Sequence, residues 1–157
     1  MKKDESSDDE IYRQLQTLDK PEERVRLCFV HYLVTTLNFP KELIVIECAL
    51  TSIAHLSTQE KLPNRRLDIL CYAKGIHPEH SLYPLMICEC KAVDLTHISK
   101  RQVIGYNQLV QAPYICLVND RQTLFSWYNK EREDYIFRHD IPCYSKLIKA
   151  LSLGQAL

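Results

Sequence analysis

Five short apolar runs, rich in β-branched and aromatic residues, constrain the fold of this chain more than any other feature. They occupy residues 43–50, 66–73, 85–91, 113–120 and 123–129. Their length and composition predict strands rather than helices. Segments with three-to-four apolar spacing, at about residues 21–37, 97–111 and 143–153, predict helices between and around them. The order helix, three strands, helix, two strands, helix predicts an α/β domain, with three layers and a mixed central sheet flanked by helices.

Local signals place the ends of several elements. Asp19 is a candidate N-cap for the first helix, and Pro21 suits its first turn. The polar stretch 57–64 predicts a connection between two antiparallel strands, and residues 119–121 predict a turn.

The composition favours one globular domain. The chain has 157 residues, 46% of them hydrophobic, and contains no apolar run near 18 residues, which argues against a membrane-spanning segment. The first ten residues carry two lysines and five acids, a net charge of +2 − 5 = −3. We therefore expect residues 1–18 to form an acidic, disordered tail, and residues 19–157 to form the domain. No apolar signal segment begins the sequence, so we expect a cytoplasmic protein and no membrane partner.

Charge and cysteine content bear on function. With 20 basic and 20 acidic residues, the net charge of zero gives no overall electrostatic footprint for nucleic acid. Seven cysteines, an odd number lying mostly in apolar runs, favour buried reduced thiols over disulfides. Cys88 and Cys90 form a C-x-C pair, but no second pair stands at zinc-site spacing. We expect the protein to fold without zinc.

Charged residues inside two predicted strands indicate a site. Glu89 and Lys91 project from one face of their strand, because side chains alternate, while Cys88 and Cys90 project from the other. Asp68 lies within the preceding apolar run. Two carboxylates on neighbouring strands suit Mg²⁺, and a nearby ammonium can stabilise negative charge in phosphodiester hydrolysis.

Each of these residues also has a structural explanation. Asp68 could pair with Arg66, and Glu89 with Lys91 could form an exposed charge pair on the strand. Acids within two apolar strands, followed by a lysine at +2, are nevertheless unusual without a partner or a metal.

The order of these motifs resembles the PD-(D/E)xK nuclease superfamily. Asp68 followed by Glu89-Cys90-Lys91 is similar to its D…(D/E)xK signature. The closer likeness is to the N-terminal nuclease domain of type I restriction enzyme R subunits, in a short free-standing form, and covers about residues 19–120. It is carried by residues 21–26, 32–33, 39–44, 47, 66–69, 89–92, 102 and 106–107.

The resemblance implies a role for each matching residue. Asp68 and Glu89 would bind Mg²⁺ or Mn²⁺, with the backbone carbonyl of Cys90 as a further ligand. Lys91 would be the catalytic base or a charge stabiliser. Glu23, on the first helix, would complete the metal shell, although an acid there also favours the helix dipole. Glu47 is a secondary candidate, either a cleft acid or an edge charge.

The resemblance also implies a substrate-binding group. Gln102 and Tyr106 match a Q-x-x-x-Y element and lie on one helix face, from which both could reach the substrate. Lys100, Arg101 and Arg66 are the cations expected to contact nucleic-acid phosphates. Leu67 replaces the proline of the superfamily signature.

The leading hypothesis is a metal-dependent nuclease acting on nucleic acid, DNA above all, through metal-activated water. The sequence has no Walker-A motif, so any restriction role requires a separate motor or specificity protein. A homodimer is left open. The alternative is a non-catalytic nucleic-acid-binding or assembly module with the same fold. A redox or zinc protein using Cys88 and Cys90 is the third reading.

Overall fold

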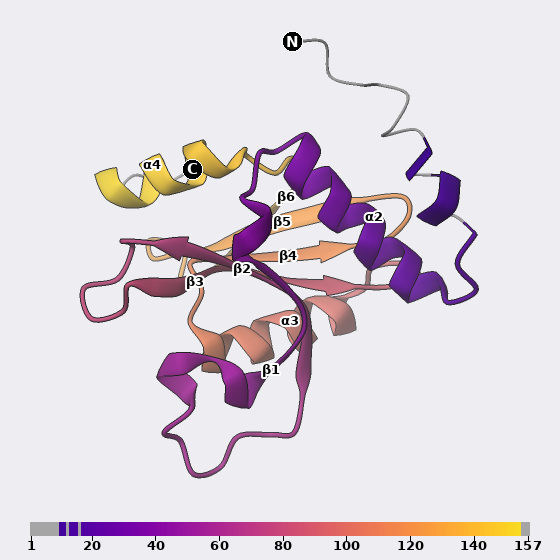
Figure 1. Cartoon of the computed structure of the whole chain (residues 1–157). Helices are drawn as coiled ribbons and strands as arrows, with labels where there is room; N and C mark the ends of the chain where they lie inside the picture. Colours follow the sequence, from indigo (N-terminus) through magenta and orange to yellow (C-terminus); the bar gives the residue numbers. More distant parts are fainter. Residues whose placement is uncertain (1–9, 12, 16, 155–157) are drawn as a thin grey trace.

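A six-stranded sheet forms the middle of three layers in the computed structural model, which describes residues 10, 11, 13–15 and 17–154 (Figure 1). The strands are β1 (Ile44–Ala49), β2 (Arg66–Lys74), β3 (Leu82–Cys90), β4 (Tyr114–Val118), β5 (Thr123–Asn129) and β6 (Asp134–Arg138). The helices are α2 (Pro21–Thr35), α3 (His97–Val110) and α4 (Tyr144–Leu153), with short 3-10 turns η1 (Lys41–Leu43), η2 (Leu50–Ser52) and η3 (Ala54–Leu56). This arrangement confirms the predicted mixed α/β class.

The order of the strands in the sheet follows the order of the chain, from β1 to β6. Every neighbouring pair is antiparallel except β3 and β4, which run parallel and are joined through α3. Parallel strands end at the same edge of a sheet, so Cys90 at the end of β3 lies beside Val118 at the end of β4. The residues that follow both strands therefore emerge together.

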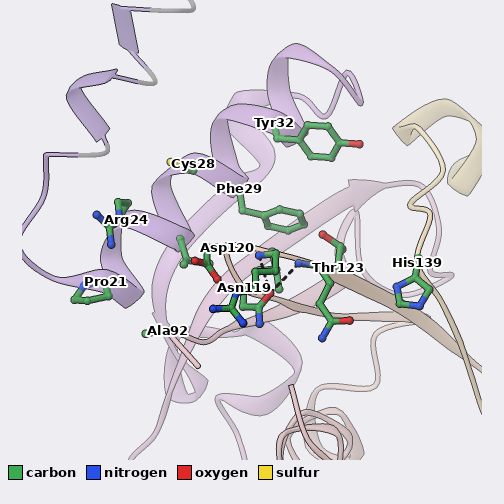
Figure 2. Close-up of a pocket in the computed structure, with 14 residues that line it drawn as sticks. Pro21, Arg24, Cys28, Phe29, Tyr32, Ala92, Asn119, Asp120, Thr123 and His139 are labelled. Atoms are coloured by element: carbon green, nitrogen blue, oxygen red, sulfur yellow. Dashed lines mark hydrogen bonds between the residues drawn. The ribbon is translucent and has the colours of Figure 1, made fainter. Parts of the chain in front are cut away.

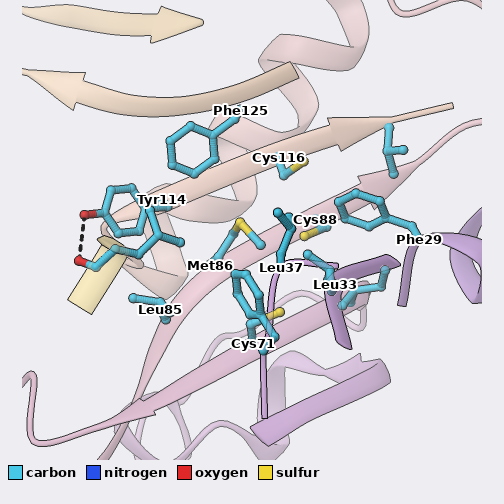
Figure 3. Packing of buried hydrophobic residues seen from close by; sticks show 14 of the residues in the cluster. Phe29, Leu33, Leu37, Cys71, Leu85, Met86, Cys88, Tyr114, Cys116 and Phe125 are labelled. Atoms are coloured by element: carbon cyan, nitrogen blue, oxygen red, sulfur yellow. Dashed lines mark hydrogen bonds between the residues drawn. The ribbon is translucent and has the colours of Figure 1, made fainter. Parts of the chain in front are cut away.

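One face of the sheet packs against α2 and α4 (Figure 1). Phe29 and Leu33 of α2 meet Met86, Cys88 and Phe125 of the sheet in this cluster (Figure 3). Complete burial of such a side chain stabilises the fold by roughly 1.5–3 kcal/mol. Helix α2 is therefore held firmly over the sheet.

The opposite face packs against α3 and the η2–η3 segment. Val103 and Val110 of α3 are buried against Leu70, Ile87 and other apolar residues of the strands. Both faces of the central strands are thus covered, and a charged group on these strands stays in water only near their ends.

Helix α2 begins where the sequence predicts, with Pro21 as its first residue. The predicted N-cap was wrong by one residue, because Lys20 occupies that position and no side chain caps the helix. The first turn instead has Pro21, whose missing N–H needs no partner, and two acids that favour the helix dipole.

The sequence reading missed two features of the sheet. Strand β6 lies at the edge, after a highly charged turn, and the sequence pattern predicts no element for its five residues. Strand β3 begins at Leu82 rather than Leu85, so it includes Pro84. Pro84 pairs with Tyr72 where the β2–β3 register shifts, and a proline is tolerated at such an irregularity because the ladder hydrogen bond is already interrupted.

Two further expectations concern the start of the chain and the cysteines. Part of the predicted tail, residues 1–9, 12 and 16, lies outside the described residues, whereas residues 10, 11 and 13–15 are helical. All seven cysteines are free, and five of them are buried, as expected. None of the helices in the described part of the chain is both long and apolar enough to cross a membrane.

Candidate functional site

The site lies where β2 and β3 separate. Backbone pairing between these strands ends at Ile69 and Cys88, and the next position would place Asp68 opposite Glu89. Instead of a backbone bond, the Asp68 carboxylate bridges the strands, with Oδ2 accepting a hydrogen bond from the Cys90 N–H at 2.7 Å. In a strand, the C=O and N–H of one residue point the same way, so the Cys90 carbonyl also faces this opening.

Glu89 lies beside this bridge and is only 7% exposed. Its Oε1 accepts hydrogen bonds from Lys91 Nζ at 2.8 Å and from Gln102 Nε2, on α3, at 2.9 Å. The backbone N–H of Lys91 donates to the Val118 carbonyl at 2.9 Å, which fixes the lysine at the end of the parallel pair. A carboxylate and an ammonium are therefore held together at this edge.

The surroundings make both carboxylates harder to ionise. Burial raises the pKa of Asp68, more than the Cys90 N–H and the positive charge of Arg26 lower it. Burial also raises the pKa of Glu89, and the negative charge of Asp68 raises it further. The hydrogen bond from Lys91 lowers this pKa but does not outweigh the other two effects. Although burial lowers the pKa of Lys91, its hydrogen bond and attraction to Glu89 dominate and raise it. Lys91 is therefore an ammonium at neutral pH.

Arg26 of α2 connects two acids from adjacent strands. Its Nη1 lies 3.6 Å from Glu47 Oε1 and 3.9 Å from Asp68 Oδ1. The Arg26 Nε is buried and has no hydrogen-bond partner among the described residues. Glu47 adopts a left-handed backbone conformation (φ 51°) in the middle of β1, which is unfavourable for a residue with a side chain. The β1–β2 pairing passes over Glu47, between Ile46 and Cys48, where its carboxylate approaches Arg26.

Glu22, one residue before the predicted Glu23, lies close enough to the site for its charge to act on both carboxylates. The charge of Glu22 contributes to raising the pKa of Asp68 and of Glu89, after the larger effect of burial. Glu22 is four residues before Arg26 and therefore shares its helix face, which is the signal that would have identified it. No described contact brings Glu23 to these residues.

The predicted substrate-binding residues divide into two groups. Gln102 contacts Glu89 and also lies 3.3 Å from the Tyr106 hydroxyl. Arg65, which the sequence reading overlooked, donates from Nη1 to the same hydroxyl at 3.4 Å. Gln102 and Tyr106 therefore belong to the site, with Arg65 as the cation beside them.

The other predicted cations lie elsewhere among the described contacts. Arg66 is exposed at the start of β2, and Arg101 is exposed on α3. Lys100 Nζ lies 4.6 Å from the centre of the Phe137 ring, over β6. None of the described interactions joins these three residues to Asp68 or Glu89.

The oxygen atoms of this site suit Mg²⁺, which needs only a few protein ligands. They do not suit a metal that needs a complete shell of protein ligands. In the described part of the chain, no three His, Cys, Asp or Glu side chains are arranged around one point. Mg²⁺ commonly binds through one or two carboxylates, with water and substrate phosphates completing its shell. Asp68 and Glu89 provide two carboxylates whose mutual repulsion a divalent cation would relieve. The Cys90 carbonyl, on the same side of its strand as the N–H that binds Asp68, would be a third oxygen.

Comparison with known proteins identifies a family for this chain. A family model described as the type I restriction enzyme R protein N terminus matches residues 21–142. No curated protein and no solved structure gives a significant match to the chain. That family is the nuclease part of restriction enzymes, which work with DNA and other subunits. Because the match includes every element from α2 to β6, and most of the 157 residues, the chain belongs to the family of type I restriction enzyme R protein N termini.

Proposed function

We propose that the protein is a Mg²⁺-dependent nuclease that hydrolyses phosphodiester bonds of DNA. The observation that supports this most directly is the convergence of Asp68, Glu89 and Lys91 where β2 and β3 separate. Two desolvated carboxylates beside an ammonium fit a site for a divalent cation and a phosphate together.

Each residue has a role that its surroundings favour. Asp68, Glu89 and the Cys90 carbonyl would hold Mg²⁺, which when bound supplies a polarised phosphate and an activated water. Lys91 has a raised pKa and stays protonated, so it suits stabilisation of negative charge on the phosphate better than removal of a proton. Gln102 positions Glu89 through its hydrogen bond.

Partners follow from charge and from the family. The net charge of zero gives weak long-range attraction to DNA, so the chain would gain affinity from another subunit. A separate motor or specificity protein fits a family that belongs to multisubunit restriction enzymes. We propose a cytoplasmic location on the same basis.

A non-catalytic assembly module is the second candidate, and one observation favours it. The carboxylates already have cationic partners within the chain, because Lys91 lies 2.8 Å from Glu89 and Arg26 lies 3.9 Å from Asp68. A site balanced in this way could persist as a structural feature without any metal.

Cleavage assays separate these candidates. Purified protein is incubated with single-stranded, duplex and branched DNA, and with RNA, in Mg²⁺ or Mn²⁺. We expect Asp68→Ala and Lys91→Ala to lower the cleavage rate on the order of a hundredfold or more, because each removes transition-state charge stabilisation. Asp68→Ala should also weaken metal binding in a titration, whereas Lys91→Ala should retain it.

Matched controls are available at the opposite end of the sheet. Lys130 and Glu131 are exposed in the β5–β6 turn, so Lys130→Ala and Glu131→Ala should cleave like the wild type. Equal cleavage by the wild type and both site variants would identify a contaminating nuclease. No cleavage of any substrate, with no measurable metal affinity, would favour the assembly module.

A further inference from the structure

A groove of about 810 Å³ lies between α2 and the turn that joins β4 to β5 (Figure 2). Arg24, Phe29 and Tyr32 line it from α2, and residues 119–123 line it from the turn. Its volume falls within the range of sites that hold a small organic ligand, roughly 300–1,000 Å³. None of the residues assigned to the carboxylate site lines this groove.

The groove begins next to Lys91. Ala92, the following residue, forms part of its wall, as does Val118. Val118 accepts the backbone hydrogen bond from Lys91 and lies on the adjacent strand, about 4.8 Å away in a sheet. In Figure 2, Ala92 lies at one end of the groove and His139 at the other. A strand of nucleic acid at Lys91 would therefore continue directly into the groove.

Two aromatic rings from α2 line the groove. The rings of Phe29 and Tyr32 are stacked, with centres 6.2 Å apart and planes inclined by 29° (Figure 2). Phe29 is buried, whereas Tyr32 is half-buried and lines the groove. Aromatic side chains of this kind bind unpaired bases by stacking, whatever the base. A paired base inside a duplex does not present its face in this way.

The rim of the groove favours an anion. Arg24 and Arg121 line it against one acid, Asp120, in a chain whose total charge is zero. Arg121 Nη1 lies 3.4 Å from Asp94 Oδ1, but these side chains are 75% and 79% exposed. An exposed pair of this kind contributes little stability, so Arg121 can turn to a phosphate at low cost.

Asn119 holds the rim in place. Its Oδ1 accepts hydrogen bonds from the backbone N–H groups of Arg121 and Gln122, at 2.9 and 2.8 Å. Its Nδ2 donates to the Val93 carbonyl at 3.0 Å, which joins the turn to the segment after Lys91. Asn119 is only 6% exposed. The turn is therefore fixed before any ligand arrives, which reduces the entropy lost on binding.

We propose that this groove binds one unpaired nucleotide of the substrate strand, next to the phosphate at Lys91. Its base would stack on Tyr32 and its phosphate would contact Arg121. The inference rests on the proposed nuclease function, because the groove would hold a part of the strand that the carboxylate site cuts. The inference predicts that the protein binds frayed or single-stranded regions in preference to intact duplex.

Binding without catalysis tests this assignment. A fluorescent single-stranded deoxyoligonucleotide of about eight nucleotides, within the usual range of single-strand site sizes, is titrated with protein in the presence of a chelator. We expect Tyr32→Ala to weaken binding about tenfold, the loss typical of one stacked base. Arg121→Ala should also weaken binding, and should reduce the slope of log K against log salt by about 0.7, as expected for one phosphate of a single strand.

Controls distinguish the groove from a general loss of charge or fold. Arg132→Ala removes an exposed arginine at the opposite end of β5 and should change neither affinity nor slope. Circular dichroism shows whether each variant is folded. Because Arg121 is exposed, Arg121→Ala should fold and still tests the groove even if Tyr32→Ala does not fold. Equal affinity of wild type and Arg121→Ala, or tighter binding of blunt duplex than of single strand, would overturn the inference.

The two proposals fail in different ways. If the wild type cleaves DNA, and the groove variants bind and cleave equally well, the groove assignment is wrong and the nuclease stands. If no substrate is cleaved, and the groove variants still lose single-strand binding, the groove stands and the nuclease proposal fails.

Discussion

Asp68 carries a negative charge that the folded protein makes costly. Burial raises its pKa despite the hydrogen bond from Cys90 and the charge of Arg26. An acid whose folded pKa is raised stabilises the fold below its unfolded pKa, near 3.9, and this contribution is lost as the pH rises through the folded value. At neutral pH the ionised Asp68 therefore lowers the stability of the protein, a cost that the proposed catalytic role would explain.

The variant Asp68→Asn tests this cost. We expect it to be more stable than the wild type at pH 7 to 8, because it has no charge to desolvate, and equal to it near pH 3. The measurement is the free energy of unfolding in urea across this pH range. Asp94→Asn, which changes an acid that is 79% exposed, should have little effect at any pH. A variant less stable than the wild type at pH 7 would show that the hydrogen bond and Arg26 outweigh burial.

Single residues also show where sequence reasoning reaches its limit. The acids at Asp68 and Glu89 could be predicted to meet, because they lie in neighbouring apolar strands. The position of Glu22 rather than Glu23 depends on how α2 is rotated over the sheet, which its packing sets. Arg65 instead of Arg66 is a similar case, since the chain bends as it enters β2. The spacing of Glu22 and Arg26 indicates that they share a helix face, but only tertiary packing decides that this face turns toward the site.

At the scale of elements, the β4–β5 turn depends on one side chain. Asn119→Ala would remove three hydrogen bonds made by a buried group, to Val93, Arg121 and Gln122. At about 1 kcal/mol net for each bond, we expect a loss of about 1–3 kcal/mol in the free energy of unfolding. Single-strand binding should weaken too, because the rim of the groove would no longer be fixed.

The matched control for this prediction is Asn129, the last residue of β5, before the β5–β6 turn. Its Oδ1 accepts one hydrogen bond, from the Arg132 N–H at 2.8 Å, so Asn129→Ala should cost less and leave binding unchanged. Urea unfolding and oligonucleotide titration measure the two effects. Equal costs for both variants would mean that Asn119 does not organise its turn.

Most elements could be predicted because their patterns are strong. Helices α2 and α3 and strands β1, β2, β4 and β5 lie close to their expected positions. The failures have physical reasons. Strand β6 is an edge strand of five residues whose charged flanks suggest a loop. Pro84 is accommodated by a register shift that no local sequence pattern predicts. The left-handed Glu47 was also unforeseen, since strand propensity favours an extended backbone throughout β1.

At the scale of the whole molecule, two clusters of buried side chains share a single sheet. Phe125 and Trp127 of β5 belong to the cluster under α2 and α4, and Leu124, the residue before Phe125, belongs to the cluster under α3. Loss of packing on one face must therefore disturb the same strands that support the other.

Phe125→Ala tests this coupling. Phe125 is fully buried, so we expect a loss of about 3–5 kcal/mol. Fluorescence of Trp127, the only tryptophan, reports on one face, and far-ultraviolet circular dichroism reports on the whole backbone. Both should give the same transition in the wild type and in the variant. Separate transitions would mean that the two faces unfold independently.

The strand order also has a consequence for how fast the chain folds. Each strand's neighbour in the sheet is its neighbour in the chain, so the β2–β3, β4–β5 and β5–β6 pairs form by closing short loops. The β1–β2 pair closes the longer segment 50–65, and the β3–β4 pair closes the longest one, the crossover through α3. The same closure brings Gln102 to Glu89 and Val118 to Lys91. We therefore expect the β3–β4 pairing to be the slowest step of folding, and this step is also the one that assembles the carboxylate site.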